Sequence, residues 1–177
     1  MMRFIKAFLF GITGLFIIIT LISLLIPSNV KVSRVVVINN TTINKVYQQT
    51  ADLKNWKNWH PMFKPGVAII NFGNITMGEN ASCDIVYNNK TTHLKITAAD
   101  SSSVKFILYS QGENDIENNI ILNAMPLPQS VQVEWRTITK LHWYPWDKFY
   151  AIFIDKMSGP GYEAALNNLN AYIEKNP

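Results

Sequence analysis

The middle of the chain, residues 66–142, is a series of short segments rich in β-branched and aromatic residues, each bounded by turn residues. Apolar and polar residues alternate along them, most clearly where Leu94 and Ile96 are flanked by His93 and Lys95. Short connections and a period of two are typical of an antiparallel sheet with one buried face. We therefore expect strands at residues 67–72, 81–87, 92–98, 104–110, 118–125 and 131–140.

Helices and one further strand flank this sheet region. Residues 31–38 predict a strand, and Thr41 or Thr42 can cap a helix over residues 43–52. A second helical region begins at Pro145. Residues 159–161, Gly-Pro-Gly, predict an interruption of it, with a new helix restarting at Pro160 and an apolar stripe from 162 to 173. The order strand, helices, sheet and long helix indicates an α+β domain.

The N-terminal segment has a different character. Residues 7–26 contain no charge and, as a helix, would extend about 30 Å, the hydrocarbon thickness of a bilayer. A cleaved signal peptide is the alternative, but its apolar region is shorter and ends in a small-x-small site. We predict an uncleaved transmembrane anchor at residues 1–30 and a soluble domain at 31–177. Arg3 and Lys6 favour a cytoplasmic N-terminus and an extracytoplasmic domain in a single-pass protein. Deleting residues 1–28 should leave a soluble, folded monomer.

Two stretches carry a family resemblance. Residues 32–63, which include DLKNWKNWHPMF, and residues 145–174 resemble the START-like superfamily, also called SRPBCC or polyketide cyclase-like, in its membrane-anchored bacterial type. The resemblance covers about residues 31–175. It implies the helix-grip fold, in which an antiparallel sheet curls around a long C-terminal helix and an apolar cavity lies between them. Members bind lipids, sterols, polyketides or hormones, and a minority are cyclases or dehydratases.

The same geometry selects candidate ligand-binding residues. A curved sheet and one helix cannot meet everywhere, so a concave apolar gap is expected between them. Phe149, Phe153 and Met157 are spaced by four and should share the helix face that looks at the concave side of the sheet. The full candidate set is Trp59, Met62, Phe63, Leu94, Phe106, Trp135, Phe149, Phe153 and Met157. In the alternative, Trp56 and Trp59 pack as core, and the large side chains fill the cavity.

Few residues indicate chemistry. The chain has 3 His and 1 Cys, with no spacing typical of a metal site, and no catalytic residue or cofactor can be named. A net charge of +4, scattered along the chain, gives no basic run of the kind that binds nucleic acid. We therefore expect a membrane-tethered module that binds a small hydrophobic or lipid-like ligand. A cyclase- or dehydratase-type enzyme and an interaction domain without ligand are the alternatives.

Overall fold

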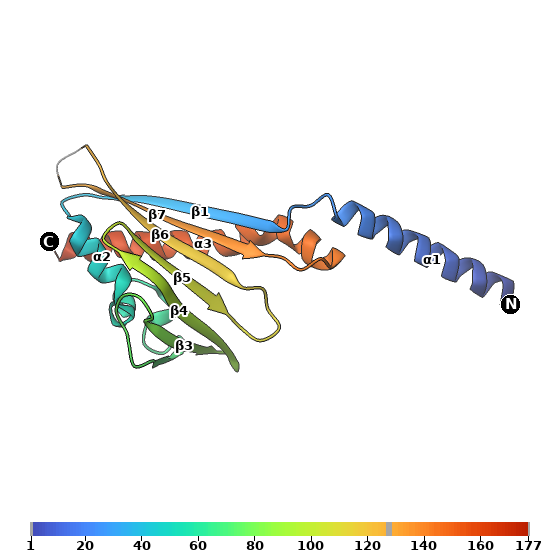
Figure 1. Ribbon diagram of the computed structural model, residues 1–177, viewed down its shortest axis with the longest axis horizontal. Coiled ribbons are helices and arrows are strands. Elements are labelled where there is room, and N and C mark those ends of the chain that lie inside the picture. The colour runs from blue at the N-terminus through green and yellow to red at the C-terminus, as the bar shows by residue number, and fades with distance from the viewer. Residues whose placement is uncertain (1, 127–128, 177) are drawn as a thin grey trace.

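The computed structural model describes residues 2–126 and 129–176. Within them a seven-stranded antiparallel sheet, ordered β1-β7-β6-β5-β4-β3-β2, curves along one side of a long C-terminal helix (Figure 1). The strands are β1 (Asn29–Ile38), β2 (Ile69–Phe72), β3 (Ser82–Tyr87), β4 (Lys90–Asp100), β5 (Ser103–Tyr109), β6 (Ile116–Ala124) and β7 (Val131–Lys140). The helices are α1 (Met2–Ser23), α2 (Ile43–Ala51), η1 (Leu53–Asn58), η2 (Pro61–Phe63) and α3 (Pro145–Lys175). The predicted α+β helix-grip fold is confirmed.

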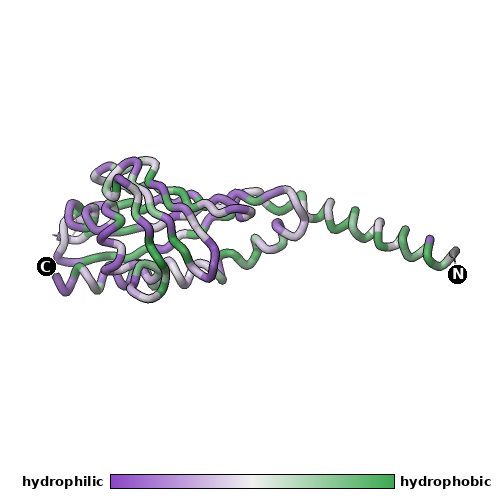
Figure 2. Tube along the Cα trace, turned by 90° about the horizontal axis from the view of Figure 1, so that it is seen from below, coloured by the Kyte–Doolittle hydropathy of each residue, from purple (hydrophilic) through white to green (hydrophobic). Residues whose placement is uncertain are grey.

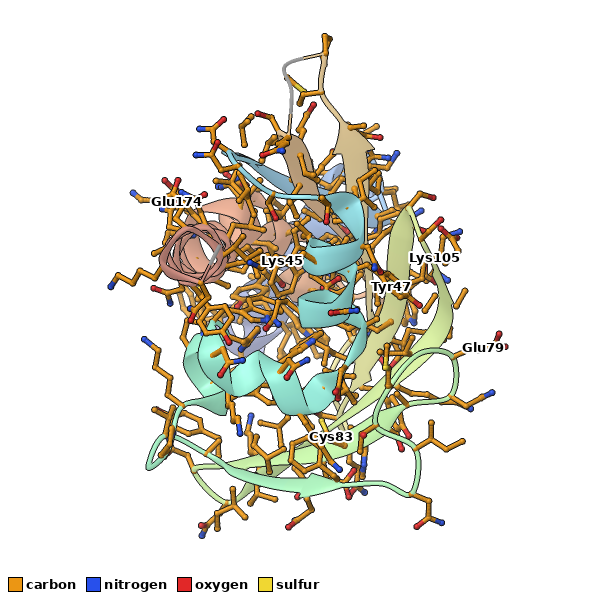
Figure 3. The ribbon with its side chains drawn as sticks, turned by 90° about the vertical axis from the view of Figure 1, so that its left-hand side faces the viewer. Lys45, Tyr47, Glu79, Cys83, Lys105 and Glu174 are labelled. Atoms are coloured by element: carbon orange, nitrogen blue, oxygen red, sulfur yellow. The ribbon has the colours of Figure 1, made fainter. Side chains whose placement is uncertain are left out.

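Alternation along the strands places the apolar face inward. In β7, Val131, Val133 and Trp135 are buried, whereas Arg136 is exposed. The register between β4 and β5 shifts between Ile96 and Ala98, which marks a bulge. A bulge bends a strand and increases its twist, so it contributes to the curvature of the sheet. Figure 3 shows the domain from the end opposite to α1. From there, the sheet and the helices α2 and α3 surround a space that side chains occupy.

The short helices form where the sequence supplies caps. Thr42 Oγ1 accepts a hydrogen bond from Lys45 N at 3.4 Å and begins α2. Asp52 ends α2 and caps η1, because its carboxylate accepts from Lys54 N at 3.0 Å. His60 caps η2, where Pro61 occupies the first turn. These caps turn the chain sharply between residues 52 and 63. The turn brings Trp56 and Trp59 against the buried face of the sheet, where both contact Trp135.

The C-terminal helix is one element, and the prediction of an interruption at residues 159–161 is wrong. α3 runs through Pro160, which is exposed, although proline lacks the N–H that would close a helical hydrogen bond. Gly159 explains why this segment packs closely, since a Cβ there would lie 2.1 Å from Arg34 Nη2 on β1. Arg34 also pairs with Asp155 at 3.0 Å. Packing of both halves of α3 on the sheet outweighs the local cost of the proline.

Helix α1 extends away from the domain (Figure 1), and most of its residues are hydrophobic (Figure 2). Most of its side chains are exposed. By length and composition, Phe4–Ser23 is able to cross a membrane. A buried lysine connects its end to the domain: Lys148 Nζ on α3 donates to Ile26 O at 3.1 Å and to Ser28 Oγ at 2.6 Å. Leu141 N donates to Ser28 O at 2.8 Å. The start of α3 therefore lies level with the end of the apolar segment.

This connection sharpens the expected result of truncation. A fragment of residues 26–177 keeps both acceptors of Lys148, whereas residues 29–177 keep neither. We expect both to fold, with 29–177 less stable by about 1–2 kcal/mol, because a buried ammonium loses its hydrogen bonds. Urea unfolding of the two fragments measures the difference. Equal stability would show that the contact is dispensable, and an unfolded 26–177 would contradict the predicted domain boundary.

Candidate functional site

A cleft of about 700 Å³ lies between the first half of α3 and the nearby ends of β6 and β7. Ile116 of β6 pairs with Thr139 of β7, which in turn pairs with Val30 at the start of β1. The cleft therefore opens at the end of the domain next to α1. Its lining is Gly112, Glu113, Asn114, Ile116, Thr139, His142, Tyr144, Trp146, Asp147, Tyr150, Ile154, Met157, Ser158 and Tyr162.

One wall of the cleft carries a polar cluster of Asn114, His142 and Asp147. Asn114 Nδ2 donates to both carboxylate oxygens of Asp147, at 3.2 and 3.1 Å. The His142 backbone N–H and its Nδ1 lie 2.9 and 3.1 Å from Asp147 Oδ2. Burial by itself would raise the pKa of Asp147, but the hydrogen bonds from Asn114 and His142 outweigh it, so this pKa is lowered. Asp147 is thus held as an anion that orients its two neighbours.

The cluster also leaves one acceptor available. Asn114 Oδ1 is buried and has no hydrogen-bond partner among the described residues. Buried polar atoms are nearly always paired, so an unpaired one at the wall of a cleft is a place for a donor group of a ligand.

Further along α3 from Asp147, the lining of the cleft is apolar and aromatic. Ile154 and Met157 of α3 contribute aliphatic surface. Tyr162 lies deeper, with its ring centroid 5.0 Å from that of buried Trp135. Burial raises the pKa of Tyr162 above its ordinary value of 10, an effect that a hydrogen bond with Thr137 partly offsets. The cleft therefore combines one polar end with an apolar side, which suits an amphipathic molecule.

Beyond Tyr162 the space between helix and sheet is closed by an aromatic cluster, defined as Trp56, Trp59, His60, Phe63, Phe106 and Trp135. Centroids of contacting rings within it are 5.1–6.4 Å apart, and all of these pairs except Trp56–His60 have the tilted or edge arrangements that aromatic pairs prefer. Its indole N–H groups are paired: Trp56 Nε1 donates to Thr50 O at 2.9 Å and Trp135 Nε1 to Asn118 Oδ1 at 3.0 Å. The central part of the gap is therefore core.

His60 belongs to this cluster as an uncharged ring. It stacks on Trp56 at 5.2 Å and also contacts Trp59, Phe63 and Trp135. Its Nδ1 accepts from Met62 N at 3.2 Å. Burial lowers the pKa of His60 from 6.5 to about 4. At neutral pH the ring is thus a neutral cap and packing group.

The sequence-predicted ligand residues divide between core and cleft. Trp59, Phe63, Leu94, Phe106 and Trp135 are buried in the core and Met62 packs against it; none of these lines the cleft. For the tryptophan pair, the alternative of core packing describes what the structure shows. Contact of these residues with a ligand stays a prediction.

The three predicted residues on α3 separate further. Met157 lines the cleft, whereas Phe149 is half-buried outside its lining. The expectation that Phe153 looks at the sheet is wrong, because its side chain is 56% exposed. A spacing of four places residues on one helix face, but it does not say which face meets the sheet.

The polar cluster was not found from the sequence. His142 and Asp147 are five residues apart, and the helix begins between them at Pro145. A carboxylate at the third position of a predicted helix was a signal that could have been used, since it can reach back to a backbone N–H that precedes the first turn. Asn114 lies in the β5–β6 loop, far from Asp147 in the sequence, and only the tertiary fold brings the two residues together.

Other reactive side chains lie elsewhere. Burial, and then the neighbouring Asp84, raise the pKa of the Cys83 thiol to about 12, so it is not a nucleophile at neutral pH. His93 Nδ1 lies 2.6 Å from Asp84 Oδ1, and neither residue lines the cleft. Among the described residues that were searched, no group of three or more His, Cys, Asp or Glu could hold a metal ion.

Comparison with known proteins supports the fold. No protein-family model matches the sequence, and no curated protein sequence matches it. Solved structures do match. Protein jhp0584 from Helicobacter pylori has a TM-score of 0.62 at 13% identity, over 80% of this chain and 86% of that one.

Two further solved structures that match are DynU16 and CalU16. DynU16, from the dynemicin biosynthetic locus, has a TM-score of 0.59 at 10% identity, over 82% of this chain and 48% of its own. CalU16 from Micromonospora echinospora has a TM-score of 0.52 at 12% identity, over 82% of this chain and 75% of its own. At such identities the likeness shows a shared helix-grip fold.

Proposed function

We propose that this protein is a membrane-tethered module that binds a small, lipid-like amphipathic ligand in the cleft between α3 and the sheet. The observation that carries the proposal is the cleft itself. Its volume of about 700 Å³ falls within the range of small-molecule sites, and its lining joins apolar surface to a few oriented polar groups. The ligand's polar end would meet Asn114 and His142, and its apolar part would lie against Ile154, Met157 and Tyr162.

The tether is α1. Its apolar length suits one crossing of a bilayer, and Arg3 and Lys6 precede the crossing. By the excess of positive charge on cytoplasmic segments, the N-terminus would lie in the cytoplasm and the domain outside it. The cleft would then sit directly above the membrane surface.

A fluorescent long-chain alcohol tests the ligand, because its hydroxyl can donate to Asn114 Oδ1. We expect 11-(dansylamino)undecan-1-ol to bind the fragment of residues 26–177 with a blue-shifted emission. Ser158→Phe should weaken binding of the probe by about tenfold or more, because a loss of only about 1.4 kcal/mol of binding free energy raises Kd tenfold. Ser158 lines the cleft from α3, and a ring at this position would occupy it.

Asn167→Phe is the matched control for this experiment. Residue 167 is exposed on the same helix and lies outside the cleft, so its replacement should leave probe binding unchanged. If wild-type protein takes up no probe, the ligand hypothesis fails, and the interaction domain without ligand becomes the better explanation. Equal weakening by both variants would show that the probe binds outside the cleft.

A second candidate function is proton transfer in a cyclase- or dehydratase-type reaction. The observation that favours it is the His142–Asp147 pair, because a carboxylate at Nδ1 fixes the ring and leaves Nε2 as the basic nitrogen. Glutamine at this position can still hydrogen bond to the ligand's polar end, but it has no basic nitrogen. Turnover of a short poly-β-ketone by wild type, lost in His142→Gln while probe binding is kept, would support this function. Absence of turnover in the probe-binding wild type would favour simple binding.

A further inference from the structure

An exposed aromatic surface lies beside the mouth of the cleft. We define the juxtamembrane face as Trp143, Trp146 and Tyr150, at the β7–α3 connection and the start of α3. The side chains of Trp143 and Trp146 are 68% and 65% exposed, and that of Tyr150 is 49% exposed. Large aromatic side chains that cluster in contact with water usually mark a surface that another phase or molecule covers.

The position of this face relative to α1 is set by Lys148. Its hydrogen bond to Ile26 O places the first turn of α3 level with the last residue of the apolar segment. Trp146 and Tyr150 are each two residues from Lys148, so they lie within about 3 Å of that level along the helix axis. Figure 1 shows the start of α3 next to the end of α1, at the same end of the domain.

We infer that the juxtamembrane face inserts into the headgroup layer of the bilayer that α1 crosses, so that the cleft opens to the membrane. Tryptophan and tyrosine are enriched at this depth because their rings are apolar at one end and polar at the other. Trp146 and Tyr150 belong both to this face and to the lining of the cleft. A lipid-like ligand would therefore enter from the bilayer without crossing water. The inference rests on the proposed tether, and it adds the docking surface and the route.

Tryptophan fluorescence in brominated lipid tests the inference. Of the 5 tryptophans, Trp56, Trp59 and Trp135 are buried in the core, and the other two belong to the juxtamembrane face. The full chain is placed in nanodiscs of phosphatidylcholine, either unlabelled or brominated near the headgroup end of the acyl chains. We expect bromine to quench a distinct part of the emission, and Trp143→Phe/Trp146→Phe to lose most of that quenching.

A matched control uses the same helix. Ala171 is exposed on α3, about 38 Å from Trp146 along the helix axis. Ala171→Trp in the double phenylalanine background should restore emission without restoring the quenching. This variant also separates true proximity to lipid from a general change in fluorescence.

Each outcome decides a different point. Equal quenching by bromine in wild type and in the double variant would overturn the docking inference. The same holds if bromine does not quench the wild-type emission and aqueous iodide does. A chain that does not co-elute with nanodiscs would overturn the tether and the docking together. Docking without binding of the fluorescent alcohol would leave this inference standing and refute the ligand proposal.

Discussion

Replacing Trp56 with alanine is expected to lower the free energy of unfolding of the domain by about 3–5 kcal/mol. The side chain is 1% exposed and contacts the rings of all five other members of the aromatic cluster: Trp59, His60, Phe63, Phe106 and Trp135. It also donates to Thr50 O, which would lose its partner. Urea unfolding of residues 26–177, followed by far-ultraviolet circular dichroism, measures the change.

Two substitutions on α3 calibrate this value. Leu169 is 0% exposed, and Leu169→Ala should cost about 2–5 kcal/mol. Phe153 is mostly exposed, and Phe153→Ala should change stability by about 0.5 kcal/mol or less. If Phe153→Ala costs as much as Leu169→Ala, the rotation of α3 against the sheet is different from the one described. A small cost for Trp56→Ala would mean that the aromatic cluster is loosely packed.

Acidification is expected to remove about 2–3 kcal/mol of stability through His60 alone. Its pKa is about 4 in the folded domain against 6.5 in the unfolded chain, because burial disfavours the charged ring. Above pH 6.5 both states hold the neutral ring, and the stability is fully present. As pH falls from 6.5 toward 4 the unfolded chain takes up the proton first, so stability is lost across this window. Below pH 4 the folded ring is protonated too, and the loss from this group ends.

His60→Asn isolates this effect from other titrating groups. Asparagine can still cap η2 with its side-chain oxygen, but it has no proton to gain in this range. The quantity measured is the difference in unfolding free energy between wild type and variant from pH 7 to pH 4. Between pH 7 and pH 4 the wild type should lose about 2–3 kcal/mol more stability than the variant. Parallel curves would show that His60 is accessible to water and titrates in the same range in both states.

The aromatic cluster and the cleft give different roles to the two ends of the domain. Near Trp56 and Trp59 the gap between helix and sheet is filled, and substitutions there should affect stability more than binding. Next to α1 the gap stays open, with Ser158 and Met157 on its helical wall and His142 at its polar end. Stability and ligand binding are therefore expected to respond to different sets of substitutions.

Local patterns in the sequence determined most of the fold. Alternation over residues 131–140 identified β7 and its inward face, because side chains point to opposite sides of a strand in turn. The cap at Thr42 and the apolar run at 7–26 are also local signals, and both correspond to helices in the structure. The helix-grip architecture followed from the order of these elements and from the resemblance.

Features that depend on contacts between distant segments of the chain were decided only by the tertiary structure. Whether Gly159 and Pro160 end a helix depends on how closely α3 approaches Arg34 on β1, which no local pattern reports. The cleft is what side chains leave unfilled, so its position depends on the rotation of α3 and on the volume of the aromatic cluster. Asn114 joins Asp147 because the β5–β6 loop folds against the start of α3. Periodicity determines which faces are apolar, whereas packing determines which of them meet and where a gap stays open.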